Sequence, residues 1–120
     1  MNASRGYLDY LSDIYDMMSK IESFTTGIDF DAFVADDKTY MAVVRGLEVI
    51  GEAAKQISPT LRKRYPRVPW KRMAGMRDKL IHAYFGTDAK IVWETATDLV
   101  PYLKPLIQQV IEAESPGTQS

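Results

Sequence analysis

The sequence predicts an all-α fold: an up-and-down bundle of four main helices with additional short helices and a kinked C-terminal helix. Apolar residues recur at alternating steps of three and four along every long segment, and no segment sustains a period-two alternation. The length of 120 residues suits one domain with a single core. The clearest apolar stripes are Tyr7, Leu11, Ile14, Met18 and Ile21; Tyr40, Val43, Leu47, Ile50, Ala54 and Ile57; and Val92, Ala96, Leu99, Leu103, Leu106 and Val110.

The first half of the chain predicts two long helices with a short one between them. The first helix carries the first stripe and ends before Gly27, which breaks the helical pattern. A short helix over residues 30–35 follows, with Asp29 or Asp31 as its N-cap. The second long helix is predicted over residues 37–57.

Two glycines and two acids stand out within this second long helix. Gly46 and Gly51 each cost about 1 kcal/mol relative to alanine, so we expect close helix crossings at both positions. Glu48 and Glu52 lie four residues apart and could form a carboxylate pair, but flanking basic residues favour a solvated ion-pair face. The flanking basic residues are Arg45 and Lys55.

Capping residues divide the second half of the chain. Ser58 can cap a short helix that begins with Pro59, and a further main helix is predicted over residues 70–85. Gly86 is expected to terminate that helix in a left-handed conformation. Asp88 is expected to cap the final helix.

The final helix contains two prolines, each of which removes a backbone donor and clashes with the preceding turn. Pro101 and Pro105 therefore predict a kink near residues 97–101 rather than two separate helices. We expect a single domain over residues 1–113. The tail over residues 114–120 has little to bury and is expected to be disordered.

Composition excludes several classes of site. The absence of cysteine excludes disulfides, thiolate metal sites and a cysteine nucleophile. His82 is the single histidine, which makes a zinc site within one chain a poor fit, and we predict no metal and no other cofactor. No apolar stretch reaches the roughly 18 to 20 residues of a membrane span, and the N-terminus lacks the pattern of a secretory signal. We expect a cytoplasmic protein with no membrane partner.

Charge is distributed unevenly along the chain. Eight basic residues and one acid give the segment 62–79 a charge of +7, and the net charge of −1 leaves −8 for the remainder. Such a segment is typical of a phosphate-binding surface, with a solvated helix face as the alternative. The basic residues are Arg62, Lys63, Arg64, Arg67, Lys71, Arg72, Arg77 and Lys79.

The end of this segment carries residues suited to cleaving RNA. Asp78 and His82 are four apart on the predicted helix, so the carboxylate could orient the imidazole, and Arg77 and Tyr84 share a face. Arg77 and His82 diverge by about 140°, so either the last turn loosens or a second copy supplies the missing group.

A chemical count favours the second copy. Metal-free RNA cleavage needs a base, an acid and a cation for the phosphorane, and one chain offers only His82 as a residue that titrates near neutrality. A twofold dimer would supply two copies of His82 and of Arg77. The alternatives are that His82 is a helix cap or packing residue and that Arg77 pairs with a surface acid.

The spacing of Arg77, His82 and Tyr84 resembles the hallmark of the HEPN domain proteins, and specifically of the HepT-like toxins of HEPN/MNT toxin–antitoxin systems. Residues 46–58, 68–86 and 91–105 resemble further stretches of this family. One departure is Asp78, where the family more often has asparagine, and this puts the hydrogen-bond partner of His82 in doubt.

The resemblance implies a helical homodimer with a metal-independent endoribonuclease site at its interface. It implies that Arg77 binds the scissile phosphate, that His82 transfers protons and that Asp78 supports it. Tyr84 resembles the residue to which a partner antitoxin, a small nucleotidyltransferase, transfers AMP to block the site. The basic segment would guide the RNA backbone through Lys71, Arg72 and Lys79.

Two rival hypotheses remain at this stage. The same cationic helix could belong to a non-catalytic module that binds a nucleotide or a nucleotidyltransferase, which predicts saturable binding without turnover. A purely structural helical dimer would bind neither RNA nor nucleotide at physiological salt.

Overall fold

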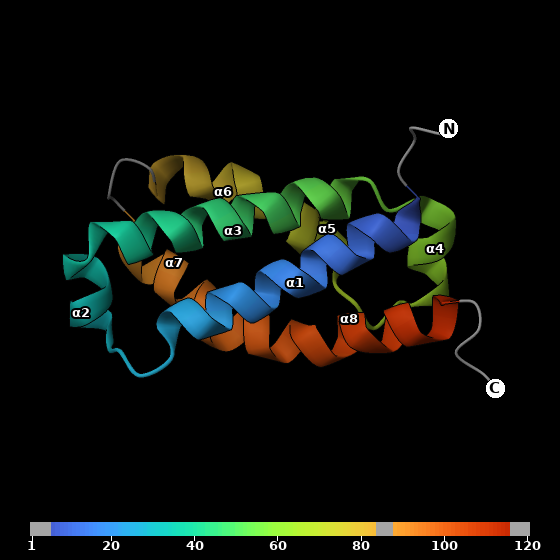
Figure 1. The fold of residues 1–120 in the computed structure, drawn as a ribbon. Coiled ribbons are helices and arrows are strands. Elements are labelled where there is room, and N and C mark those ends of the chain that lie inside the picture. The colour runs from blue at the N-terminus through green and yellow to red at the C-terminus, as the bar shows by residue number, and fades with distance from the viewer. Residues whose placement is uncertain (1–5, 84–87, 116–120) are drawn as a thin grey trace.

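The computed structural model describes residues 6–83 and 88–115, with the backbone only for Lys79 and residues 81–83. This part of the chain folds into helices without strands, which confirms the predicted all-α bundle (Figure 1). The elements are α1 (Tyr7–Thr25), α2 (Phe30–Ala35), α3 (Asp37–Lys55), α4 (Pro59–Arg64), α5 (Trp70–Ala74), α6 (Met76–Ala83), α7 (Ala89–Glu94), the π-helical turn η1 (Thr95–Leu99) and α8 (Val100–Glu114).

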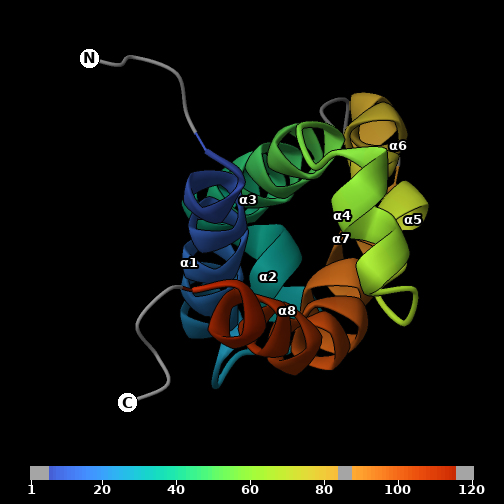
Figure 2. The ribbon, with the colours of Figure 1, turned by 90° about the vertical axis from the view of Figure 1, so that its right-hand side faces the viewer.

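The three long helices enclose the core. Helix α1 packs against both α3 and α8, and α5 and α6 pack against α3. Seen along the bundle, α4 to α6 lie on the side opposite α1 (Figure 2). The buried faces follow the predicted apolar stripes at Leu11, Ile14, Met18 and Ile21 on α1 and at Leu103 and Val110 on α8. Two positions differ from the prediction: Tyr7 is 43% exposed, and Ile107 of α8 is fully buried whereas the predicted Leu106 is only partly buried.

Side-chain caps start the short helices as the sequence predicts. The Asp29 carboxylate accepts a hydrogen bond of 2.9 Å from the backbone N–H of Ala32, so Asp29 rather than Asp31 caps α2. Ser58 accepts one of 3.2 Å from the N–H of Leu61, with Pro59 in the first turn of α4. The cap of α3 is Asp36, which is not among the predicted caps.

The predicted helix over residues 70–85 is wrong in its continuity. Helix α5 ends at Ala74, Gly75 forms a turn, and α6 begins at Met76. The N–H of Gly75 donates to the carbonyl of Lys71 at 3.0 Å, which closes α5. Glycine is among the poorest helix formers, which weakens the helix at this position. The predicted end at Phe85 and Gly86 lies outside the described residues.

The C-terminal helix bends through a π-helical turn. Residues 95–99 form η1 between α7 and α8, which confirms the predicted kink near residues 97–101. Pro101 stands in the first turn of α8, where its missing N–H is tolerated, and Pro105 lies inside α8. Asp88 occupies the N-cap position of α7, but its side chain makes no capping hydrogen bond, contrary to the prediction.

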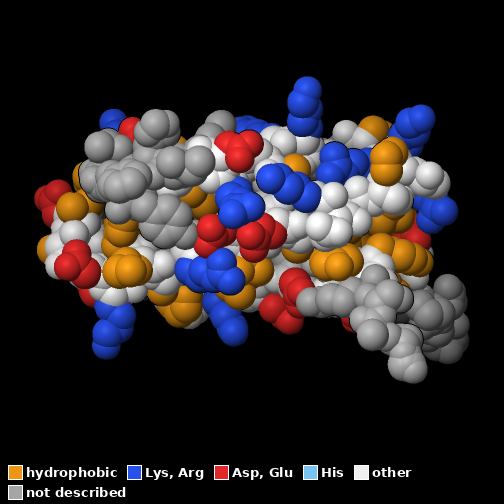
Figure 3. All heavy atoms as spheres, turned by 90° about the horizontal axis from the view of Figure 1, so that it is seen from above, with side chains coloured by type: hydrophobic (Ala, Val, Ile, Leu, Met, Phe, Trp, Pro, Cys, Tyr) orange, Lys and Arg blue, Asp and Glu red, His pale blue; other side chains and the backbone are white. Residues whose placement is uncertain are grey.

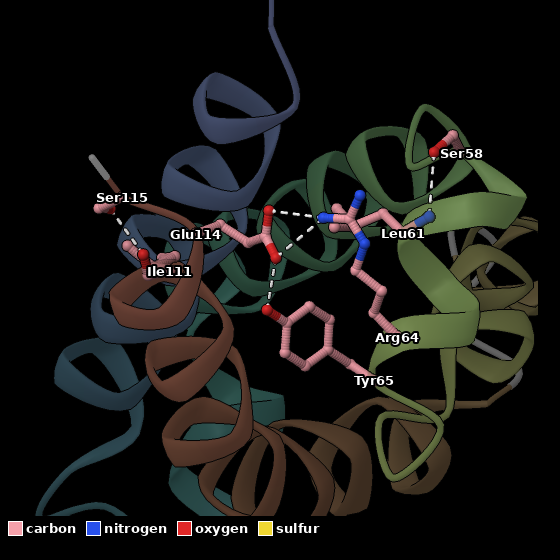
Figure 4. A network of polar contacts seen from close by, with 7 residues as sticks. All are labelled: Ser58, Leu61, Arg64, Tyr65, Ile111, Glu114 and Ser115. Carbon is pink, nitrogen blue, oxygen red and sulfur yellow. Dashed lines mark hydrogen bonds and ion pairs between the residues drawn. The ribbon is translucent and has the colours of Figure 1, made fainter.

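Helix α8 extends one residue beyond the predicted domain end. Glu114, expected in a disordered tail, is the last helical residue, and its carboxylate joins α8 to the end of α4 (Figure 4). It accepts hydrogen bonds from the Tyr65 hydroxyl at 2.5 Å and from Arg64 Nη1 at 3.0 Å. The Tyr65 bond and, to a lesser degree, Arg64 lower the pKa of Glu114 below its ordinary value. Residues 116–120 lie outside the described part.

Candidate nucleic-acid interface

Helix α6 lies against α3 at a glycine. A Cβ atom on Gly51 would lie 3.1 Å from the backbone nitrogen of Arg77 and 3.4 Å from the carbonyl oxygen of Met73. Because both neighbours are backbone atoms, a larger residue would push α6 away. Gly46 makes a similar approach to Ile21 of α1, where a Cβ would lie 3.0 Å from the side chain. Both predicted close crossings are confirmed.

The Arg77 side chain is 51% exposed on α6 and faces two acids of α3. Its Nε atom lies 3.8 Å from Glu48 Oε2 and 3.7 Å from Glu52 Oε2. The predicted ion-pair face on α3 is confirmed for Arg45, whose Nη1 lies 2.7 Å from Glu48 Oε1. On the face that carries α6 and α3, acidic and basic side chains alternate near the centre (Figure 3).

Besides Arg45, the cation that pairs with Glu48 and Glu52 is Arg77 and not Lys55. No ion pair of Lys55 is present among the described residues, whereas Arg77 reaches both Glu48 and Glu52. The alternative that Arg77 pairs with surface acids is therefore what the geometry shows. These ion pairs are compatible with phosphate binding, because both carboxylates approach Nε and half of the Arg77 side chain stays exposed.

The backbone of His82 lies in the last turn of α6. Helix α6 is α-helical through Ala83, so Asp78 and His82 stand one turn apart and Arg77 and His82 diverge around the helix, as the spacing predicts. Asp78 is exposed in the first turn. The His82 side chain and all of Tyr84 lie outside the described part, so the Asp78–His82 contact stays a prediction.

Some cations of the basic segment hold the fold together. Arg62 Nε donates to the carbonyl of Ile57 at 3.0 Å, and its Nη2 donates to the carbonyl of Ala54 at 2.8 Å. These bonds satisfy backbone acceptors at the C-terminal end of α3. Arg64 is bonded to Glu114, as described above. Both arginines were predicted to belong to a phosphate-binding surface, and their positions in the sequence do not indicate these contacts.

The α5 side of the segment is open. Lys71 and Arg72 are exposed, and the side chain of Lys79 lies outside the description. A shallow groove of about 650 Å³ combines these two cations with an apolar surface. Its lining residues are Arg62, Pro66, Val68, Pro69, Trp70, Lys71 and Arg72. Such a combination suits the charged backbone and apolar faces of a nucleic acid.

A second, larger groove of about 770 Å³ lies between α5, α6 and the C-terminal helix. Arg72 borders it as well, but its other charged residues are acids: Asp88, Glu94 and Asp98. This surface would repel a phosphate backbone, so of these two grooves the first suits an anion better.

Two properties of the described part bear on its chemistry. No group of three or more His, Asp or Glu side chains is placed to hold a metal ion there. None of the helices over residues 6–83 and 88–115 combines the length and apolarity that crossing a bilayer requires.

Comparison with known proteins identifies the family. Residues 14–110 match the family model described as "Ribonuclease HepT-like". A protein named "Probable ribonuclease HepT" from Thermococcus cleftensis is 49% identical over 100 residues, which cover 83% of this chain and 91% of the relative. A protein named "Putative RNase" from Methanocaldococcus jannaschii is 46% identical over 103 residues, or 86% of this chain and 89% of the relative.

A third relative covers almost the whole chain. It is a protein named "Putative RNase" from Caldanaerobacter subterraneus, 39% identical over 115 residues, or 95% of this chain and 99% of the relative. No solved structure matches at a significant level. The chain belongs to the HepT-like ribonuclease family, which confirms the resemblance carried by the spacing of Arg77, His82 and Tyr84.

Proposed function

We propose that this chain is a metal-independent endoribonuclease whose active site forms where α6 of two identical copies meet. The observation that carries the proposal is the Arg77 guanidinium, half exposed on α6 one and a half turns from His82. Membership of the HepT-like ribonuclease family supports RNA as the substrate class.

The chemistry assigns one role to each residue. Arg77 binds the scissile phosphate and stabilises the charge that develops on the phosphorane. His82 transfers protons: one copy deprotonates the 2′-hydroxyl and the other protonates the leaving oxygen. Asp78, one turn before His82, orients its imidazole.

Helix geometry is the reason for requiring two copies. Because α6 stays α-helical through Ala83, the backbone positions of Arg77 and His82 in one chain are about 140° apart around the helix axis. A twofold axis beside α6 brings each arginine towards the histidine of the partner. Lys71, Arg72 and Lys79 then guide the RNA backbone towards the interface.

The test is cleavage of RNA in the presence of a chelator. Wild type is expected to cleave, and Arg77→Ala and His82→Ala are each expected to lose at least about a hundredfold in rate. Lys63→Ala is the matched control, since it removes an exposed cation of the same segment outside the site. Equal cleavage by all four proteins would overturn the proposal.

Regulation by a partner forms a separate part of the proposal. Tyr84 lies two residues after His82, and the family resemblance supports its modification with AMP by a nucleotidyltransferase antitoxin, which makes the chain the toxin of the pair. A phosphate and a nucleoside on Tyr84 would block RNA entry. Mass spectrometry after coexpression with a nucleotidyltransferase antitoxin of the type that the resemblance implies should show an added AMP in wild type and none in Tyr84→Phe. An AMP-sized shift that persists in Tyr84→Phe contradicts this assignment.

One observation favours the alternative of a non-catalytic module that binds a nucleotide or a nucleotidyltransferase. Glu48 and Glu52 already neutralise Arg77 in part, as in a structural ion pair. This alternative predicts saturable nucleotide binding with no cleavage of RNA by wild type, and the same chelator experiment separates it from the nuclease.

A further inference from the structure

Three residues on one face of α3 lie close to Arg77. Glu48, Gly51 and Glu52 are spaced by three and four residues, so they lie on the same side of α3. Gly51 lets the backbone of α6 approach at Arg77, and the two carboxylates lie within 4 Å of Arg77 Nε. The approach of the helices and the two ion pairs therefore act on the same residue.

The ion pairs join the carboxylates to Nε and not to the two amino nitrogens. At 3.8 and 3.7 Å they are too long to be hydrogen bonds, so their effect is Coulombic. Neither amino nitrogen of Arg77 makes a hydrogen bond with any residue that the structure describes. A guanidinium held at Nε keeps the pair of N–H groups used in bidentate phosphate binding.

The two acids differ in solvent exposure. The Glu48 side chain is 14% exposed and is also bound by Arg45, so its position is fixed from two directions. The Glu52 side chain is 44% exposed and can adjust. Glu48 thus supplies a fixed charge near Arg77, and Glu52 supplies a second one from the solvent side.

We propose that Glu48 and Glu52 are positioning residues, which hold the Arg77 guanidinium by its Nε end so that its amino edge meets the scissile phosphate. The proposal rests on the proposed ribonuclease function and adds two residues of α3 to it. The same carboxylates repel the RNA backbone, so positioning raises the turnover rate at some cost in RNA affinity.

Positioning of Arg77 and repulsion of RNA have different effects on kcat and KM, so the two can be measured together. In the variant Glu48→Gln/Glu52→Gln, kcat is expected to fall about tenfold to a hundredfold, as for a displaced catalytic group. KM is expected to fall as well, since two negative charges near the RNA are gone. Glu112→Gln is the matched control, an exposed acid on α8, and should change neither value. Folded fractions are measured for every variant.

Three results would overturn the proposal. An unchanged kcat with a lower KM means that the acids only repel RNA. An unchanged kcat and KM means that they do not act on the site. A lower kcat that matches the loss of folded protein, with KM constant, means that they serve stability alone.

A second measurement separates failure of this inference from failure of the proposed function. In an Arg77→Ala background the two glutamine substitutions should cause no further loss of residual cleavage, because their effect passes through Arg77. If Arg77→Ala cleaves like wild type, the ribonuclease proposal itself fails. If Arg77→Ala is inactive and Glu48→Gln/Glu52→Gln retains full kcat, only the positioning role fails.

Discussion

The two ends of the basic segment 62–79 use the same residue type for different purposes. On α4, Arg62 bonds to two backbone carbonyls and Arg64 bonds to Glu114, so both guanidiniums are bound within the fold. On α6, the contacts of Arg77 with the described residues are long ion pairs through Nε, and its side chain stays half exposed. The comparison shows that a local charge of +7 overstates the positive surface available to RNA, because part of it is already bonded to the protein.

The largest effect on stability is expected for Arg62→Ala. It removes two charge-assisted hydrogen bonds to Ile57 and Ala54 and should lower the free energy of unfolding by about 2 kcal/mol. The kcat of RNA cleavage, measured on folded protein, should change little, because the Arg62 guanidinium is bonded to backbone carbonyls although the side chain borders the α5 groove. Denaturant unfolding beside a cleavage assay checks both, and Lys63→Ala serves as the matched control. A loss of cleavage without a loss of stability would mean that Arg62 acts in the site, and would contradict the difference drawn between the arginines of α4 and Arg77.

Gly51→Ala tests the α6 end of the basic segment. The new Cβ meets backbone atoms of Arg77 and Met73 and must displace α6, at a cost of about 1 to 2 kcal/mol in unfolding free energy. Because the displaced helix carries Arg77, cleavage should also fall. The measurement is unfolding together with kcat. Gly46→Ala is the control: it meets the side chain of Ile21 and should reduce stability without reducing kcat in the folded fraction.

Glu114→Gln tests the contact that closes α4 onto α8. The free energy of unfolding should fall by about 1 kcal/mol near neutral pH, because the hydrogen bonds from Tyr65 and Arg64 lose their charged acceptor. The folded-state pKa of Glu114 is lowered, so its contribution is present above the ordinary value of 4.5 and is lost as the pH falls through the folded-state pKa.

The pH dependence supplies the check on this contact. Wild type should lose stability on acidification below about pH 4.5, and the difference between wild type and Glu114→Gln should shrink there. A difference that stays constant down to pH 2 would contradict an ionised Glu114 as the source of stability.

The smallest effect on stability is expected for Lys71→Gln/Arg72→Gln. Both side chains are exposed, and their loss should change the free energy of unfolding by less than about 0.5 kcal/mol. RNA binding should weaken, and the slope of log affinity against log salt should become shallower by about two. Titrations at several salt concentrations measure the slope. An unchanged slope would remove α5 from the RNA path.

Local rules account for most of the fold. Apolar periodicity placed the long helices, and Ser58 and Asp29 act as caps because a cap depends on residues only three positions away. The break at Gly75 was missed, since a single glycine inside a helical pattern is often tolerated and the outcome depends on packing. Glu114 was assigned to the tail because its partners, Arg64 and Tyr65, are distant in sequence.

The candidate site also has parts that local sequence patterns predict and a part that they do not. The spacing of Arg77, His82 and Tyr84 and the acid pair on α3 are both visible in the sequence, each as a local pattern. Their contact, which brings Glu48 and Glu52 to Arg77, depends on the packing of α3 on α6 and has no local signature. The signal that could have pointed to it is Gly51, whose helix-breaking tendency predicted a close crossing at that place.

The proposed active site needs α6 from two copies of the chain, and a mixing experiment tests this requirement most directly. Wild type is coexpressed with increasing amounts of an Arg77→Ala/His82→Ala chain, and cleavage is measured per wild-type chain. If the site needs both copies, activity should fall to about half at equal amounts and to about a tenth at a ninefold excess of the inactive chain, as random pairing requires. Activity per wild-type chain that stays constant at every ratio would contradict the composite site.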